Sequence, residues 1–405
     1  MFDILIKKGT IVDGSGRKRF IGDIGIINDR ISFIGKIEKK YGKRIIDASG
    51  MIVTPGFIDC HSHGDYNFLT ETTAYNLLLQ GVTTELTGHC GSSISPCKEL
   101  SQDIKTYIPK DKHETLEKKC QAFNDFINYV DNISLATNMG FFVGHGSVRE
   151  VVMGYEDRNP TEDELKAMKD ILKVAMESGA LGMSSGLIYP PGVYAKEEEI
   201  IELLKLVSSY GGVYTSHMRS EGDRVIESVR ETINAAKEAD VPVVISHHKI
   251  IGKDNWGKSI ETLELVDEAN KSGVRVYLDQ YPFNAGATSL INSLPPEYAN
   301  EGQARLIEKL KDDRIRLEVK NKLSTKSKTF ENLIYGAGLE GVFIGNVPGY
   351  ENLSNKSILE ISKILDKDPY DTIFDLVIQT EGSLGAVYFI ACEDDIERVI
   401  STLIP

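Results

Sequence analysis

The sequence predicts an α/β fold, a (β/α)8 barrel of the TIM type that lacks its last strand and follows a small N-terminal β-module. Three observations support this prediction. Short alternating runs fill residues 1–55, nearly continuous apolar runs recur with helix-period segments between them from residue 56 onward, and polar side chains follow several of these runs. Buried parallel strands that alternate with helices are typical of a barrel. We therefore predict a β-sandwich-like module at 1–55 and a barrel domain at 56–405.

The N-terminal residues are predicted to form a small sheet. Apolar and polar residues alternate over several short segments, and turn sequences such as Asp13-Gly14-Ser15-Gly16 and Asn28-Asp29 separate them. A period of two with turns of this kind predicts antiparallel strands. A sheet of this size is marginally stable by itself, so we expect it to pack on the main domain. The expected strands are 3–7, 24–27, 30–34 and 44–46.

From residue 56 onward, apolar runs alternate with segments of helical periodicity. One helix is expected to begin at Thr161, because Thr161 and Glu164 have the spacing of a capping box, and to stop at Gly179. Another is expected at 196–209. Residues 294–356 break the rhythm and are predicted to be a rim insertion that shapes the substrate pocket, with a charged helix at 305–323. The expected barrel strands are 56–60, 82–87, 138–143, 180–184, 212–216, 241–246 and 274–279.

The composition is that of a globular, acidic enzyme. The net charge is −14, and 41% of the residues are hydrophobic. A nucleic-acid-binding face needs clustered Lys and Arg, so we expect neither nucleic acid nor an anionic membrane as partner. The N-terminus lacks a signal peptide pattern, and no run approaches the roughly 18 apolar residues of a membrane span. The five cysteines, irregularly spaced, fit reduced thiols, so a cytoplasmic location is expected.

Histidine and cysteine follow the ends of four predicted strands. Six of the eight histidines fall at these positions, and Cys90 closes a strand-like run that begins at Gly81. The carboxyl ends of barrel strands meet at one face, so these side chains are expected to converge. Thiolate, imidazole and carboxylate are the usual zinc ligands, and a catalytic site keeps one position open for water. The pattern predicts a metal centre among His61, His63, His89, Cys90, His217, His247 and His248.

Each of these residues also has a simpler interpretation. A single histidine is more often a hydrogen-bonded structural residue than a ligand, and a free cysteine is commonly a small buried hydrophobe. A nucleophilic Cys90 is a third alternative. The number of histidines at strand ends favours the metal centre, because a Cys/His catalytic pair does not need so many. Beside a cation, Cys90 would be a thiolate ligand.

Six segments at the predicted strand ends carry a resemblance to a known family. They are Pro55-Gly-Phe-Ile-Asp-Cys-His-Ser-His-Gly-Asp65, Gly88-His-Cys-Gly91, Gly144-His-Gly-Ser-Val-Arg149, Ser184-Ser-Gly-Leu-Ile-Tyr-Pro-Pro-Gly192, Ser216-His-Met-Arg-Ser-Glu-Gly-Asp223 and Ile245-Ser-His-His-Lys249. Together they resemble the N-acyl-D-amino-acid deacylase (D-aminoacylase) family of the amidohydrolase superfamily. The resemblance spans residues 1 to about 400.

The resemblance implies a hydrolase that uses Zn2+. It implies a tight metal site at Cys90, His217 and His247, and a second, weaker site at His61 and His63.

The resemblance also implies residues that bind the substrate. Lys249 and Tyr281 match the family, and Tyr189 is a further candidate. A compact cationic lysine suits a free α-carboxylate. Ala287 stands where the family often has a hydroxyl, so Thr288 is a candidate to replace it, with Ser289 as the alternative.

One departure concerns the catalytic base. The family has a Gly-Ser-Asp-Gly motif at the end of strand eight, whose Asp is a metal ligand and the general base, whereas this chain ends at Pro405 without it. No catalytic base is therefore assigned, strand eight is expected to be missing, and so are partner strands for the N-terminal module. The alternative takes 387–391 as strand eight and Asp394 or Asp395 as base.

The resemblance and the ligand pattern predict hydrolysis of N-acyl-D-amino acids to a D-amino acid and a carboxylate, impaired in this chain. A cyclic-amide hydrolase of the hydantoinase or dihydroorotase type is one alternative, although the run Gly182-Met-Ser-Ser-Gly186 has no Lys for a bridging carbamate. A truncated, catalytically weak metal-binding homologue is the other. The expected partner is the small-molecule substrate, and the oligomeric state is left open.

Overall fold

The computed structural model describes residues 1–38, 42–100, 104–105, 108–347 and 351–402. The chain divides into two compact units. The first comprises Met1–Ile58 with Tyr75–Thr84, and the second Asp59–Ala74 with Glu85–Pro405. The predicted domain boundary at residue 55 stays a prediction. Residues 348–350 of the predicted insertion and 403–405 of the chain end lie outside the described residues.

The first unit is built on a five-stranded sheet in the order β3-β2-β1-β4, with β5 also paired to β1. The hairpin-connected strands β1, β2 and β3 are antiparallel, as predicted. The prediction was wrong for β4, which pairs parallel to β1 because it does not reach β1 through a tight turn. The strand β5, which was not predicted, also pairs parallel to β1. The strands are β1 (Phe2–Ile11), β2 (Phe20–Ile27), β3 (Arg30–Gly35), β4 (Gly42–Asp47) and β5 (Ile52–Val53); the unit also holds the short helix α1 (Tyr75–Leu78).

The barrel strands form where the sequence predicts them. Five of them make a parallel sheet in the order β13-β12-β11-β10-β9, and β6, β7 and β8 make a three-stranded sheet. Each of the seven predicted strands overlaps an observed one. They are β6 (Phe57–Asp59), β7 (Val82–Thr87), β8 (Asn138–Phe141) continued by β9 (Val143–Gly144), β10 (Gly182–Gly186), β11 (Val213–His217), β12 (Val243–Ile245) and β13 (Val276–Leu278).

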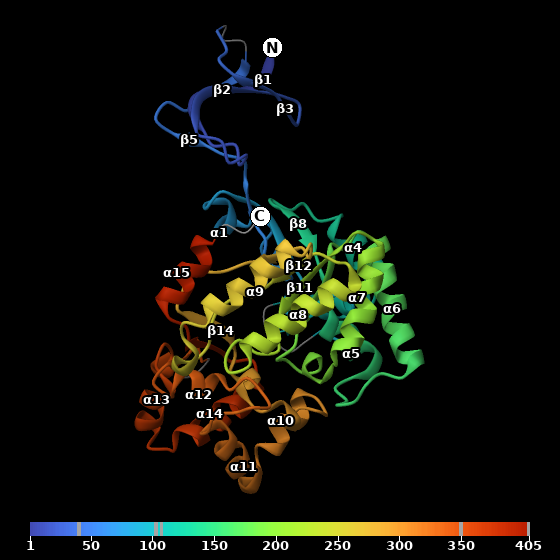
Figure 1. The fold of residues 1–405 in the computed structure, drawn as a ribbon, viewed down its shortest axis with the longest axis vertical. Helices are drawn as coiled ribbons and strands as arrows, with labels where there is room; N and C mark the ends of the chain where they lie inside the picture. Colours follow the sequence, from blue (N-terminus) through green and yellow to red (C-terminus); the bar gives the residue numbers. More distant parts are fainter. Residues whose placement is uncertain (39–41, 101–103, 106–107, 348–350, 403–405) are drawn as a thin grey trace. The chain divides into compact units, whose positions relative to one another are not determined.

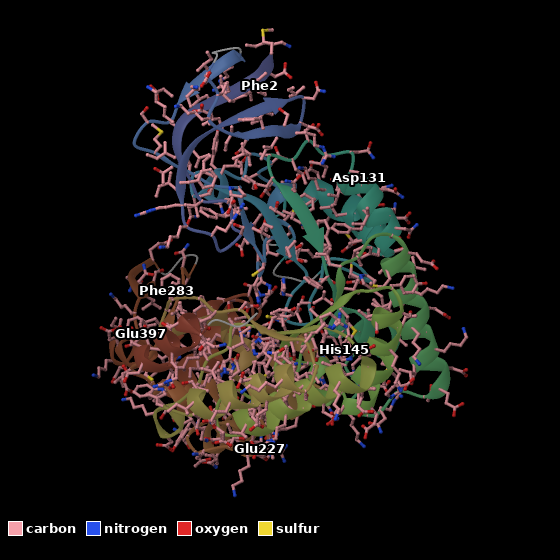
Figure 2. All side chains as sticks on the ribbon, turned by 45° about the horizontal axis from the view of Figure 1, so that its top comes forward. Phe2, Asp131, His145, Glu227, Phe283 and Glu397 are labelled. Atoms are coloured by element: carbon pink, nitrogen blue, oxygen red, sulfur yellow. The ribbon has the colours of Figure 1, made fainter. Side chains whose placement is uncertain are left out.

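Helices between these strands cover the barrel. Neighbouring helices α6, α7, α8 and α9 pack against one another in this order (Figure 1). The Thr161 hydroxyl accepts a hydrogen bond from the Glu164 backbone N–H, and the Glu164 carboxylate accepts one from the Thr161 backbone N–H. The predicted capping box therefore starts α6. Glu227, labelled in Figure 2, marks the exposed face of α8. The helices are α3 (His113–Cys120), α4 (Phe123–Val130), α5 (His145–Met153), α6 (Glu162–Glu177), α7 (Glu197–Ser209), α8 (Val225–Ala239) and α9 (Ser259–Lys271).

Residues beyond β13 build a smaller part of the second unit with its own hydrophobic core. Its helices, orange to red in Figure 1, lie near the antiparallel sheet β14-β16-β15, except the last helix, which packs beside α9. The predicted single helix 305–323 was wrong, because Asp312 caps a second helix after a break. The elements are β14 (Ala285–Ser289), α10 (Gln303–Lys309), α11 (Asp313–Leu323), α12 (Leu333–Ala337), β15 (Val342–Ile344), α13 (Ile358–Leu365), α14 (Pro369–Gln379), β16 (Gly385–Phe389) and α15 (Glu393–Ser401).

The structure excludes one alternative for the eighth barrel strand. Residues 385–389 form β16, which pairs antiparallel with β14 and β15 instead of joining the parallel sheet. Among the described residues, no eighth parallel strand follows β13 in that sheet. In the same residues, no helix has the length and apolar character to cross a membrane.

Candidate metal centre

The predicted ligands come together at the carboxyl ends of the strands. His61 and His63 follow β6, Cys90 follows β7, His217 ends β11, and His247 follows β12. Two triplets have one ligand atom from each member within 4.8 Å of the others: His61, His63 and Cys90, and Cys90, His217 and His247. Cys90 belongs to both triplets, so its Sγ lies where two metal positions would meet.

Close backbone packing holds Cys90 in this position. Gly91 has a φ of +76°, and a Cβ on it would lie 2.4 Å from the backbone nitrogen of Gly186. A side chain at this point would push the ends of β7 and β10 apart. Cys90 has a φ of +53° and His247 a φ of +37°. This conformation costs about 1–3 kcal/mol for a residue with a Cβ, and such strain concentrates at functional sites.

Two carboxylates orient the histidines. Asp279 lies 3.0 Å from His61 Nδ1 and accepts the backbone N–H of His247, and Glu221 lies 2.9 Å from His247 Nδ1. Each contact leaves Nε2 free to face Cys90, and the Sγ lies 3.5 Å from His61 Nε2 and 3.4 Å from His247 Nε2. Partners of this kind fix the tautomer and direction of a metal-binding histidine.

The electrostatics of the cluster suit a cation. Burial lowers the pKa of His217 and His247 well below the ordinary value, so both rings are neutral and offer lone pairs. Burial raises the pKa of the Cys90 thiol, with a further rise from nearby Asp279. Both ring nitrogens of His217 are buried without a hydrogen-bond partner among the described residues. The donor set therefore fits a metal ion, which deprotonates a coordinating thiol and takes up an imidazole lone pair.

The other two strand-end histidines belong to neither triplet. His89 stacks on His61 with ring centroids 4.1 Å apart, and its Nδ1 lies 3.4 Å from the Thr215 hydroxyl. His248 is fully buried, and its Nε2 lies 2.8 Å from the Thr262 hydroxyl. His248 therefore fits the interpretation as a hydrogen-bonded structural residue. His89 instead stabilises the orientation of the His61 ring by stacking on it.

A cavity of about 620 Å3 opens over the triplets. Its lining includes all four residues predicted to bind substrate: Lys249, Tyr281, Tyr189 and Thr288. The ring of Tyr189 meets His217 edge-on with centroids 4.9 Å apart, and Lys249 Nζ lies 5.6 Å from the Tyr281 ring centroid. Phe283, labelled in Figure 2, is exposed and lines the same cavity.

Lys249 is a buried cation at the wall of this cavity. Its Nζ donates to Glu221 at 2.6 Å. Burial lowers the pKa of Lys249, but the Glu221 carboxylate more than offsets this, so the pKa is raised and the ammonium stays charged. The cavity therefore presents one fixed positive charge beside the metal ligands.

Three polar residues of the cavity escaped the sequence prediction as site residues. Glu221 and Asp279 orient the histidines, and the amide of Gln280 lines the cavity with both polar atoms buried and without a partner among the described residues. Glu221 belongs to the segment 216–223, one of the six that carry the family resemblance, and Asp279 ends the expected strand 274–279. A carboxylate four residues after a strand-end histidine was the available signal for Glu221.

The structure contradicts the alternative catalytic bases. Asp395 lies on α15, where it accepts the backbone N–H of Gly257 and pairs with Arg398. Asp394 is exposed on the same helix. Neither lines the cavity over the triplets, because β16 belongs to the smaller sheet and α15 packs beside α9.

The chain is similar in sequence to known amidohydrolases. The model of the amidohydrolase family matches residues 44–319. D-aminoacylase of Alcaligenes xylosoxydans xylosoxydans is 34% identical over 400 residues, which cover 99% of this chain and 72% of the relative. N-acyl-D-glutamate deacylase of the same organism is 34% identical over 302 residues, which cover 74% of this chain and 60% of the relative.

The fold is similar to those of solved deacylase structures. The N-acyl-D-glutamate deacylase of Bordetella bronchiseptica, complexed with zinc and a phosphonate inhibitor that mimics the tetrahedral intermediate, superposes with a TM-score of 0.79 at 28% identity. A D-aminoacylase crystal structure gives 0.77 at 33%. Each alignment covers 99% of this chain and 74% of the other. The chain thus spans about three fifths to three quarters of the length of these relatives.

Proposed function

This chain belongs to the amidohydrolase family, among the relatives of D-aminoacylase, and on that basis we propose that it hydrolyses the amide bond of N-acyl-D-amino acids. The products are a D-amino acid and a carboxylic acid. The observation that carries the proposal is the placement of the Cys90–His217–His247 triplet and the Lys249 ammonium at one cavity. A hydrolytic centre thereby faces a site for the substrate's carboxylate.

We propose Zn2+ as the metal, with Cys90, His217 and His247 as its primary ligands. Thiolate and imidazole are the ligands that zinc prefers, and three protein ligands leave a coordination position open. His61 and His63 would hold a second ion that shares Cys90. This choice of metal agrees with the zinc in the Bordetella bronchiseptica structure. When bound, the ion supplies acidification of a water molecule and polarisation of the amide carbonyl.

The side chains around the metal position have separate tasks in the proposed reaction. Glu221 fixes the His247 ring, and Asp279 fixes the His61 ring. Lys249 binds the substrate carboxylate, with Tyr281 and Tyr189 as the aromatic walls of the cavity. The reaction forms a bond from the water oxygen to the carbonyl carbon and breaks the bond to nitrogen, so the leaving amine takes up a proton.

A free carboxylate for this proton transfer is missing from the described part of the chain. The carboxylates that line the cavity there are Asp59, Glu221 and Asp279. Asp59 accepts the His61 backbone N–H, and the other two are bound to histidine rings. We therefore propose that the described residues bind metal and substrate but transfer the proton slowly. This proposal is close to the alternative of a catalytically weak, metal-binding homologue, but it keeps the substrate site and a slow reaction.

The cyclic-amide alternative has less support. A bridging carbamate needs a lysine at the end of β10, but this strand carries Ser184 and Ser185 there, both fully buried. Cys90 occupies the shared position between the triplets. We also propose a cytoplasmic location, which fits five cysteines that are all free of disulfides.

The test is a measurement of bound zinc on the purified chain, followed by hydrolysis of N-acetyl-D-methionine and its L-isomer. We expect about one tightly bound zinc per chain and hydrolysis of the D-isomer alone. Equal rates on the two isomers would contradict the D-aminoacylase assignment. A chain without bound metal would contradict the metal centre.

A further inference from the structure

A second cavity, of about 500 Å3, adjoins the one over the metal ligands. The two cavities share five lining residues, among them Cys90 and Tyr189. From this junction the second cavity extends between the loops that follow β7 and β10, the helix α5 and the segment 287–306. A substrate whose amide lies at Cys90 would therefore have one half in each cavity.

The charges that line the two cavities indicate which half of the substrate lies in which cavity. The first contains the Lys249 ammonium. Among the described residues, the lining of the second contains no Lys or Arg, and its acidic residues are Asp65 and Glu150. The first cavity therefore offers a cation to a carboxylate and the described lining of the second does not, so the amino-acid half of the substrate belongs in the first.

The second cavity has apolar lining residues that the first cavity does not share. Ile94, Ile291, Leu294 and Leu306 line it, and each is at most 7% exposed. They come from the loop after β7, from the segment between β14 and α10, and from α10 itself. Apolar side chains on both sides of a cavity favour an aliphatic occupant.

Several polar side chains of the same lining are already paired inside the protein. Ser93 donates to the Ser95 carbonyl at 2.7 Å, and Ser147 donates to the Ser93 carbonyl at 3.1 Å. The Asn292 amide donates to the Thr288 hydroxyl at 3.1 Å. These paired groups therefore add little demand for a polar ligand.

The size of the cavity sets a lower limit on the group it suits. A protein cavity of about 150 Å3 holds benzene, which has six heavy atoms. An acetyl group has three heavy atoms and would leave most of a 500 Å3 cavity to water. A tightly fitting group is therefore considerably larger than acetyl.

From these observations we propose that the second cavity is the acyl subsite and that it takes an unbranched aliphatic acyl group of at least about six carbons. The inference rests on the proposed deacylase function and specifies its substrate class as medium- to long-chain N-acyl-D-amino acids. Ala299 contributes to the lining and is 7% exposed, so a larger side chain there occupies part of the acyl subsite.

The experiment compares N-octanoyl-D-methionine with N-acetyl-D-methionine on the zinc-loaded chain. Dissociation constants are measured by calorimetry, and kcat/KM is measured where turnover allows it. Each buried methylene favours binding by up to about fourfold. We expect the octanoyl compound to bind at least about tenfold more tightly. Ala299→Leu should lower this ratio at least about fivefold, whereas Ala269→Leu, an equally exposed alanine on α9 that lines neither cavity, should leave it unchanged.

Each possible outcome supports or overturns the acyl subsite. Equal affinity for the two compounds overturns the acyl subsite while leaving the deacylase proposal intact. An equal loss in Ala299→Leu and Ala269→Leu also overturns it. Failure of both compounds to bind, or equal binding of their L-isomers, overturns the deacylase proposal and the subsite with it. If Ala299→Leu does not fold, Gln303→Phe fills the same cavity from a half-buried position and replaces it.

Discussion

At the scale of single residues, Cys90 is the side chain on which both metal positions depend. It is the one member that the two triplets share. Cys90→Ala should reduce bound zinc from about one per chain to less than about a tenth, because both ligand sets lose their thiolate. Metal analysis after gel filtration checks this. Cys97→Ala is the control, since Cys97 lines neither cavity; retention of zinc by Cys90→Ala would remove the thiolate from the site.

Glu221 acts on the metal through a histidine. Its carboxylate meets both His247 Nδ1 and Lys249 Nζ. Loss of an orienting carboxylate usually costs about 10- to 100-fold in metal affinity, so we expect Glu221→Gln to weaken zinc binding by this factor. Competition with a chelator of known affinity measures it. Glu231→Gln, which removes a partner of Arg219 outside the cavity, should keep the original affinity. An unchanged affinity in Glu221→Gln would assign the contact to packing alone.

Lys249 should act on the substrate instead. Lys249→Met removes the cation of the cavity but none of the proposed ligands. A hydrogen bond to a charged group contributes about 1.5–3 kcal/mol, so KM for an N-acyl-D-amino acid should rise roughly 10- to 150-fold. Steady-state kinetics and metal content together check this prediction. Lys258→Met is the control, because Lys258 bonds to Asn255 away from the cavity. An unchanged KM would exclude Lys249 from the carboxylate site.

At the scale of secondary-structure elements, a buried ion pair joins α5 to α7 under the site. Glu199 accepts from His145 Nε2 at 2.8 Å and from the fully buried Arg149. Burial raises the pKa of Glu199, but His145 and Arg149 more than offset this and lower it below 4.5. The lowered value means that the stabilisation is present above about pH 4.5 and is lost as the pH falls through the folded-state value.

Replacing this carboxylate should therefore be costly. Glu199→Gln leaves the Arg149 charge buried without its partner, which typically costs about 3–5 kcal/mol in the free energy of unfolding. Urea denaturation at pH 7 measures the loss, and a series at lower pH should show the wild type approaching the variant below about pH 4.5. Glu198→Gln on the same helix is exposed and should change stability by less than about 0.5 kcal/mol. A similar loss in both variants would contradict the role of the pair.

The elements also show what a sequence can predict. Barrel strands such as β12 were predictable because they lie in nearly continuous apolar runs between polar or glycine-containing segments, and barrel topology then brought Cys90 and His217 together. The parallel pairing of β4 was not, because it depends on a contact with a distant strand. Glu221 and Asp279 were missed for the same reason: a carboxylate is ordinary in sequence until a histidine ring 26 or 218 positions away points at it.

At the scale of the whole molecule, the second unit combines two hydrophobic cores. One lies under the barrel helices and holds β11 and β12, whose ends carry His217 and His247. The other holds the segment beyond β13 that forms one wall of both cavities, through residues such as Leu333 and Leu306. Two of the proposed metal ligands are thus carried by one core and the substrate walls partly by the other. Substitutions in the second core should alter substrate preference more than metal affinity.

The metal cavity as a whole has no free carboxylate among the described residues. Each carboxylate that the described residues contribute to the metal cavity is already bonded to a histidine ring or backbone, so none is free to transfer the proton. Loss of a general base costs roughly 10²- to 10⁴-fold in rate, and we expect hydrolysis of N-acetyl-D-methionine to be slower than that of D-aminoacylase by this factor. Added formate, a carboxylate small enough to enter the 620 Å3 cavity, should restore part of the rate in proportion to its concentration, whereas chloride at equal ionic strength should not. A rate equal to that of D-aminoacylase without formate would mean that one of the three bonded carboxylates releases its partner and serves as the base.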